Sequence, residues 1–195
     1  MRVLVACEYS GRVRDAFIRN GHDAVSVDLL PTDQPGPHYQ GDVFDVIDKG
    51  WDLMVAHPPC TYLANSGARW LYAGGELQAD RLAQLQAGAL FFQRLWMHDI
   101  PHIAMENPIM LNRAKEFIGV GRPTQTIQPW QFGHGETKAT CLWLKNLPEL
   151  VPTNVVEGRE QRIHQLPPTA DRWKLRSTTF QGIADAMGAQ WGSLA

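Results

Sequence analysis

The chain has 195 residues, 44% of them hydrophobic, so it is long enough to bury a full core as one globular domain. Its formal net charge of −2 argues against a protein that coats nucleic acid electrostatically, although a local basic face remains compatible with it. No apolar run reaches the length of a membrane span, and no charged-then-apolar leader opens the chain.

The cysteines indicate the redox environment of the protein, and the absence of linkers indicates the number of its domains. Cys7, Cys60 and Cys141 are an odd number without disulfide-framework or CxxC spacing, so we expect a reducing, cytoplasmic environment and no metal site. No internal repeat, low-complexity tract or long linker divides the sequence. We therefore expect a single domain over residues 1–195.

The N-terminal segment is typical of a strand–helix–strand unit. Arg2–Ala6 is a short apolar run that predicts a buried strand, and Cys7–Gly11 forms the turn after it. Apolar residues then recur at helical spacing, before Asp23–Val27 predicts a second strand that ends at Asp28. In a nucleotide-binding unit of this kind, the acid takes the ribose hydroxyls and the helix start faces the ligand. An ordinary βαβ unit explains the pattern equally well, since Gly11 is the only glycine in the turn.

The next segment brings a second acid to the same edge. Pro31–Gln40 is a loop rich in Pro, Gly and Asp, and Asp42 follows it where a third strand would end, before a short helix to about Lys49. Asp42 has two interpretations of equal weight. It holds the amino group of an adenine, or it caps the helix that it precedes.

The stretch Trp51–Cys60 is the centre of the sequence argument. Leu53–Ala56 predicts a buried strand, and Pro58 and Pro59 end it because proline lacks the N–H that a central sheet ladder needs. Cys60 follows at once, at the carboxyl end of the strand, where open α/β sheets bind ligands. A buried structural cysteine is the alternative, because free cysteine is among the residues most often buried.

A loop and a long helix follow. Thr61–Gly75 has no regular pattern and contains Ser66, and it is interpreted as a mobile lid beside Cys60 or as a plain surface loop. Leu77–Met97 predicts the longest helix. Its apolar stripe is interpreted as core and consists of Leu82, Leu85, Ala89, Phe92 and Trp96.

A second strand end repeats the pattern of the first. Ile103–Met105 predicts a buried strand that ends in Glu106-Asn107-Pro108, again with proline directly after polar residues. Adjacent parallel strands lie about 4.8 Å apart. We therefore expect Cys60 and Glu106 to face one crevice at the carboxyl edge of the sheet.

The remaining elements are predicted from their apolar patterns. They are a helix at Asn112–Ile118, strands at Gln125–Gln131 and Thr140–Leu144 around a turn at Phe132–Lys138, and a closing helix at Phe180–Trp191. The segment Asn146–Arg176 is poor in regular pattern, and its basic residues are Arg159, Arg162, Arg172, Lys174 and Arg176. These residues form a solvated basic loop or an edge that contacts phosphates.

The two strand-end motifs, Pro58-Pro59-Cys60 and then Glu106-Asn107-Pro108, resemble the C5-cytosine DNA methyltransferase family, particularly its small phage and prophage members. The wider resemblance covers the turn after the first strand, Asp28, Gly41-Asp42 and Ser177–Trp191. It implies the α/β fold of class I S-adenosylmethionine-dependent methyltransferases, which is Rossmann-like, with a mostly parallel sheet and helices on both faces. It also implies an enzyme in the cytoplasm of a bacterium or of a phage-infected host cell.

The resemblance implies roles for Cys60 and Glu106. Carbon 5 of cytosine is a weak nucleophile, and a thiolate that adds to C6 moves electron density to C5. Cys60 matches the family's thiol, and Glu106 matches the acid that binds N3 and the exocyclic amine. Because a base inside a duplex is inaccessible, the cytosine would be flipped out of the DNA.

The resemblance also assigns the rest of the site. S-adenosylmethionine would be bound by Glu8, Tyr9, Ser10, Gly11, Asp28, Asp42 and Pro58. The cytosine and its DNA would be bound by Ser66, Asn107, Pro108, Arg172 and Arg176. Lys138 lies within Gly135–Thr140, where the family has paired arginines, and it would act as a point charge without the planar fork of arginine.

Between Gly135–Thr140 and the closing helix there is no room for a target-recognition domain. We therefore expect specificity for a few base pairs at most, unless a homodimer or a specificity partner adds contacts. Two other functions stay open: methylation of RNA or a free cytosine nucleotide, and a catalytically weak module that binds DNA or a host methyltransferase. An amino-group methyltransferase is disfavoured, because those enzymes usually carry an aromatic residue at the position of Cys60.

Overall fold

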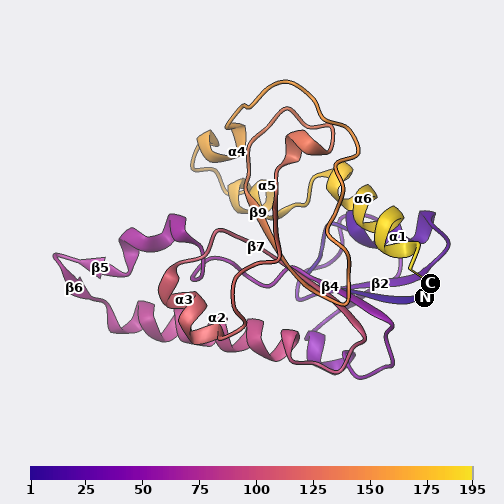
Figure 1. Ribbon diagram of the computed structural model, residues 1–195. Helices are drawn as coiled ribbons and strands as arrows, with labels where there is room; N and C mark the ends of the chain where they lie inside the picture. Colours follow the sequence, from indigo (N-terminus) through magenta and orange to yellow (C-terminus); the bar gives the residue numbers. More distant parts are fainter. Residues whose placement is uncertain (195) are drawn as a thin grey trace.

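The computed structural model describes residues 1–194, and a seven-stranded sheet forms its centre (Figure 1). The strands are β1 (Arg2–Ala6), β2 (Asp23–Asp28), β3 (His38–Gln40), β4 (Leu53–Ala56), β7 (His102–Pro108), β8 (Gln125–Ile127) and β9 (Thr140–Lys145). Their order in the sheet is β3-β2-β1-β4-β7-β9-β8. The first five strands of this order are parallel, while β9 runs antiparallel to both of its neighbours.

Helices cover both faces of the sheet, because successive side chains of a strand point to opposite faces. One face packs against η1 (Val43–Asp45), α2 (Ala79–Trp96) and α3 (Asn112–Ile118), and its strand residues include Leu4, Ala6, Met54 and Ala56. The other face packs against α1 (Arg12–Arg19) and α6 (Gln181–Gly192), and its strand residues include Val3, Val5, Leu53 and Val55.

The two helices of the second face touch at a glycine. A Cβ atom at Gly188 of α6 would lie 2.7 Å from the backbone of Ala16 in α1, closer than van der Waals contact allows. The missing side chain therefore lets α6 pack directly on α1, next to the turn that follows β1.

Most predicted elements are confirmed. The strands Arg2–Ala6 and Leu53–Ala56 and the helix Asn112–Ile118 have the predicted bounds. The predicted stripe of the long helix is buried at Leu85, Ala89 and Phe92, while Leu82 and Trp96 are only partly buried, and Leu95 completes the stripe.

Several predicted boundaries are wrong. The predicted strand Gln125–Gln131 ends at Ile127 because Pro129 begins a 3-10 helix, η3 (Pro129–Gln131). The predicted loop Pro31–Gln40 ends in the short strand β3, and the helix predicted to reach Lys49 is only the 3-10 turn η1.

Strand β7 continues through Glu106-Asn107-Pro108 instead of stopping there. Its pairing with β4 ends at Met105, but the pairs Glu106 with Leu142, Asn107 with Cys141 and Pro108 with Thr140 extend it along β9. Pairing with β9 thus keeps Glu106-Asn107-Pro108 in strand conformation beyond the point where β4 ends.

Two segments project from the sheet (Figure 1). The arm, residues 61–78, contains η2 (Asn65–Trp70) and a hairpin of β5 (Tyr72–Ala73) and β6 (Glu76–Leu77), where the sequence predicted an irregular loop and the start of the long helix. The cap, residues 129–138 and 154–177, contains η3, α4 (Arg162–Gln165) and α5 (Arg172–Ser177). Two isolated bridges, Phe132 with Asn154 and Glu136 with Glu160, join its two parts.

None of the helices within residues 1–194 is both long and apolar enough to cross a bilayer.

Candidate active site

His57 and Glu106 meet where β4 ends beside β7. Ala56 pairs with Met105 in the sheet, so the next residue of each strand lies at the same level. His57 Nδ1 lies 3.1 Å from Glu106 Oε2, and the two side chains are 8% and 16% exposed. Because an ionised carboxylate only accepts hydrogen bonds, Nδ1 is the donor.

Asn107 connects the two strand-end motifs. Its side-chain Nδ2 donates a 2.9 Å hydrogen bond to the carbonyl oxygen of Pro58, inside the protein. Its Oδ1 is also buried and has no partner within the described residues. The sequence predicted a substrate contact for Asn107, and the structure shows that its amide nitrogen holds the loop that carries Cys60.

Cys60 lies in the electrostatic field of three charged groups. Burial raises the pKa of its thiol, and the negative charge of Glu106 raises it further. The positive charges of Lys138 and Arg176 act in the opposite direction without cancelling the rise. The structure thus brings Cys60, Glu106, Lys138 and Arg176 together, as the sequence predicted for the first two.

Glu106 is charged although it is buried. Burial by itself would raise the pKa of this carboxyl group, but the hydrogen bond and charge of His57 outweigh burial, with help from Lys138, and the net pKa is lowered. The unliganded site therefore favours the carboxylate form.

Lys138 is held in place by the C-terminal part of the chain. Its Nζ donates a 2.7 Å hydrogen bond to the carbonyl of Arg176 in α5 and lies 5.9 Å from the ring centroid of Phe180. Its backbone N–H donates to Gln128 Oε1 at 3.0 Å. Arg176 and Phe180 therefore hold the ammonium group, and Gln128 holds the backbone that carries it.

Asp28 and Asp42 lie at the carboxyl ends of β2 and β3, around the end of β1. Burial raises the pKa of Cys7 to about 12, and the charges of Asp28 and Asp42 contribute to that rise, so both carboxylates face this point. Asp28 accepts the N–H of Leu30 at 2.9 Å, and Asp42 caps η1 by accepting the N–H of Phe44 at 3.0 Å. The capping interpretation of Asp42 is confirmed.

This edge fits the adenosine end of S-adenosylmethionine. Two carboxylates supply acceptors for ribose hydroxyls and an adenine amine. Leu29 directly follows Asp28 and is 74% exposed, which leaves an apolar surface where an adenine ring would lie.

The residues of the turn after β1 that were predicted to bind S-adenosylmethionine have partners within the protein. Glu8 accepts the N–H groups of Val13 and Arg14 at 2.7 and 3.3 Å and the hydroxyl of Ser10 at 3.0 Å, so this carboxylate satisfies the start of α1. Tyr9 donates its hydroxyl to the carbonyl of Lys174 at 2.9 Å. Gly11 has the left-handed backbone (φ 74°) that turns the chain into α1.

The other predicted substrate residues are dispersed. Ser66 is exposed on η2 of the arm, and Pro108 is the last residue of β7, paired with Thr140. Arg172 donates from Nε to the carbonyl of Leu166 at 2.8 Å, within the cap. Arg176 of this group acts on Cys60 electrostatically.

His57 is the site residue that the sequence argument missed. It lies within the organising stretch, but a lone histidine before two prolines carried no assigned role. The available signal was a polar side chain at the last position before the chain leaves the sheet.

No cluster of three or more His, Cys, Asp or Glu side chains within residues 1–194 is arranged to hold a metal ion. The three cysteines are free.

The chain is similar to known proteins in structure and not in sequence. No family model and no curated protein sequence matches the chain. The Entamoeba histolytica methyltransferase EhMeth is similar in structure, with a TM-score of 0.51 and 13% identity over 87% of this chain and 61% of that one. The chain has the class I methyltransferase fold.

Two further structures have lower TM-scores. A protein described as a DNA modification methyltransferase encoded within an E. coli prophage has a TM-score of 0.47 and 14% identity, over 87% of this chain and 56% of that chain. A mutant of Spodoptera frugiperda DNMT2 has a TM-score of 0.40 and 14% identity, over 80% and 54% of the two chains. This chain spans less than two thirds of each of the three structures.

Proposed function

We propose that this protein uses S-adenosylmethionine to methylate carbon 5 of cytosine in DNA, through a covalent adduct of Cys60. The observation that carries the proposal is the assembly of a thiol and a buried acid at one sheet edge. Cys60 and Glu106 interact electrostatically, and the bonds from His57 to Glu106 and from Asn107 to Pro58 fix both partners. The methyltransferase fold supplies the context for that pair.

Cys60 and Glu106 activate the ring together. The thiolate adds to C6, while Glu106 donates a proton to N3 and binds the exocyclic amine, so that electron density collects at C5. The ring that receives this proton is positively charged, which offsets the repulsion between Glu106 and the Cys60 thiolate, and Lys138 and Arg176 also stabilise the thiolate. After methyl transfer a water molecule takes the C5 proton, and elimination of the thiolate releases Cys60.

The methyl donor would be held at the neighbouring strand ends. When bound, S-adenosylmethionine supplies an electrophilic methyl group. Asp28 would accept the ribose hydroxyls, Leu29 would pack against the adenine, and the exposed Asp42 would accept the adenine amine beside its capping bond.

DNA is the proposed substrate because the site is flanked by groups suited to nucleic acid. The arm exposes 59% of Trp70 and 48% of Tyr72, and the Arg69 guanidinium stacks 4.8 Å from the Trp70 ring centroid. Aromatic faces and arginine stack on unpaired bases. The flipped base would reach Cys60 between the arm and the cap.

The test is a covalent trap. Purified protein, S-adenosylmethionine and duplex DNA containing 5-fluorocytosine should give an adduct that survives denaturing electrophoresis, because fluorine at C5 blocks the final elimination. Cys60→Ser should form none, and Cys141→Ser should form as much as the native protein. An undiminished adduct with Cys60→Ser would refute the assignment.

Nucleoside mass spectrometry identifies the substrate class. We expect 5-methylcytosine in DNA from cells that express the protein. Methylcytosine confined to RNA or to the nucleotide pool would instead support the alternative substrates.

A further inference from the structure

His57 has no part in the chemistry described so far, although its imidazole is hydrogen-bonded to the Glu106 carboxylate. Its Nδ1 binds the carboxylate, and its Nε2 is buried without a partner within residues 1–194. The hydrogen bond from Nδ1 to the carboxylate indicates that His57 does more than fill space in the core. Leaving its other nitrogen unsatisfied costs free energy as well.

The acid role of Glu106 conflicts with its surroundings. The reaction needs a proton on this carboxyl group when N3 of cytosine arrives. His57 and Lys138 instead favour the carboxylate. At neutral pH a hydrogen-bonded neighbour is the nearest source of this proton, and His57 is the titratable side chain that is hydrogen-bonded to Glu106.

We propose that His57 is the positioning residue that supplies Glu106 with this proton, so that imidazole and carboxyl group act as one acid. This inference rests on the proposed cytosine chemistry. The pair would act in this way as an imidazolium beside the carboxylate, with Nδ1–H in the hydrogen bond that the structure shows. Two interacting groups of this kind titrate as a pair.

The proton transfer balances without another reactant. The Nδ1–H bond of His57 breaks, the Glu106 carboxyl group takes the proton and passes it on, and an N3–H bond forms with the lone pair of N3. The electron pair of the broken bond stays on Nδ1, which leaves neutral imidazole beside carboxylate. The Cys60 thiol first loses its proton to solvent. Addition of the resulting thiolate to the N3-protonated ring gives a neutral adduct, and elimination returns the N3 proton to the pair.

Charged groups from several elements surround the pair. Glu106 faces His57 from β7, and Asp28 acts on it from the end of β2. Lys138, in the turn before β9, acts on Glu106 from the other side. The imidazolium of the proposed step would thus face two carboxylates and one ammonium group.

A matched pair of variants separates proton supply from geometry. His57→Asn places an amide N–H near the position of Nδ1 and keeps a hydrogen bond to Glu106, but it cannot carry the proton. His98→Asn is the control, because His98 also binds a carboxylate, Asp48 Oδ1 at 2.9 Å, and also has a buried unpartnered nitrogen. It lies after α2, on the approach to the opposite, amino end of β7.

The readout is the rate of adduct formation with 5-fluorocytosine DNA across pH. At neutral pH we expect His57→Asn to be about a hundredfold slower than the native protein, the usual contribution of a positioned acid. The difference should shrink at acidic pH, where Glu106 is protonated from solvent. A defect equal at every pH, or no defect, overturns the proposal, and His98→Asn should match the native profile.

A second measurement needs no DNA. In the native protein, the NMR signals of the His57 imidazole and the Glu106 carboxyl carbon should shift over the same pH interval. Separate titrations would overturn the proton-sharing pair and leave the cytosine chemistry standing. Shared titration with no adduct from the native protein would refute the cytosine chemistry itself, and with it the proposed role of the pair.

Discussion

Asn107 donates its side-chain amide to the carbonyl of Pro58 across 49 residues of sequence. Asn107 is 1% exposed, so water cannot take over either group if the bond is lost. Asn107→Ala should lower the free energy of unfolding by about 1–3 kcal/mol, the cost of a buried unsatisfied carbonyl. Urea denaturation measures this loss. Asn20→Ala removes a bond of similar length to the Ala16 carbonyl on an exposed residue, and a loss as large in that control would contradict the argument.

Arg14 is a buried guanidinium on α1 that ties down the loop before β3. It is 0% exposed and donates to Asp15, Ser26, Thr32 and the carbonyls of Gln34 and Pro35. Arg14→Met should cost about 3 kcal/mol or more, because several polar groups lose their partner at once.

Arg19 on the same helix provides the control for Arg14. Its ion pair with Asp185 is about half exposed on both sides. Arg19→Met should cost at most about 1 kcal/mol. Equal losses in the two variants would show that burial does not decide the effect.

The reactivity of Cys60 should report the charge of Glu106. That charge raises the pKa of the thiol, so Glu106→Gln increases the thiolate fraction at a given pH. We expect faster alkylation of Cys60 by iodoacetamide in Glu106→Gln and slower alkylation in Lys138→Gln, resolved by peptide mass spectrometry at pH 8. Cys7, whose pKa is about 12, serves as the unreactive internal reference.

The Asp28 carboxylate should lower the folding stability of the protein at neutral pH and raise its affinity for S-adenosylmethionine. Burial raises its pKa, so the native state holds the proton more tightly than the unfolded chain does, and stability falls as pH rises through the raised value. Asp28→Asn should therefore melt at a higher temperature at neutral pH. The same variant should bind S-adenosylmethionine about ten- to a hundredfold more weakly by calorimetry. Unchanged binding would remove the proposed ribose contact.

Arg176 is expected to contact a DNA phosphate, whereas other basic residues of the cap are already engaged. Arg162 is paired with Glu136 at 2.9 Å, and Lys174 is paired with Asp33 at 2.6 Å. No ion pair of Arg176 is present within the described part of the chain. Arg176→Gln should reduce the slope of log affinity against log salt by about 0.9, while Arg162→Gln should leave the slope unchanged.

The elements that the sequence predicted well are those with a continuous apolar signal. Arg2–Ala6 and Leu53–Ala56 are buried along their whole inner length, so burial and strand formation coincide. The boundary at Ile127 was missed because apolar and polar residues continue past it, and only Pro129 marks the change to a 3-10 turn. The extension of β7 to Pro108 depends on β9, which is more than thirty residues away in sequence.

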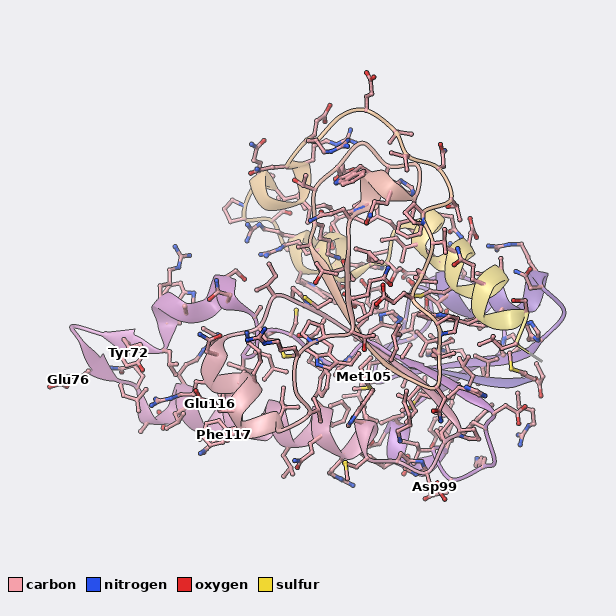
Figure 2. All side chains as sticks on the ribbon, in the orientation of Figure 1. Tyr72, Glu76, Asp99, Met105, Glu116 and Phe117 are labelled. Atoms are coloured by element: carbon pink, nitrogen blue, oxygen red, sulfur yellow. The ribbon has the colours of Figure 1, made fainter. Side chains whose placement is uncertain are left out.

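The sequence likewise predicted one part of the candidate site and missed another. The proximity of Cys60 and Glu106 follows from parallel strands that end side by side, which the two proline motifs indicated. The contacts of Arg14, Glu8 and Asn107 are long-range or buried hydrogen bonds, and residue type alone does not reveal them. Met105, which is labelled in Figure 2 and directly precedes Glu106, is fully buried, so such partners are chosen by packing.

The bond from Lys138 to the Arg176 carbonyl has a consequence for biosynthesis. Translation delivers Cys60, Glu106 and Lys138 before α5 exists, so a nascent chain carries these groups while the ammonium of Lys138 is still free to move. The site acquires its fixed cation only when α5 has left the ribosome and docked, where Tyr9 also binds the Lys174 carbonyl. Ribosome-bound fragments that stop before α5 should therefore contain the Cys60 thiol without the fixed ammonium group beside it. The reaction of Cys60 is delayed until α5 has folded against the rest of the chain.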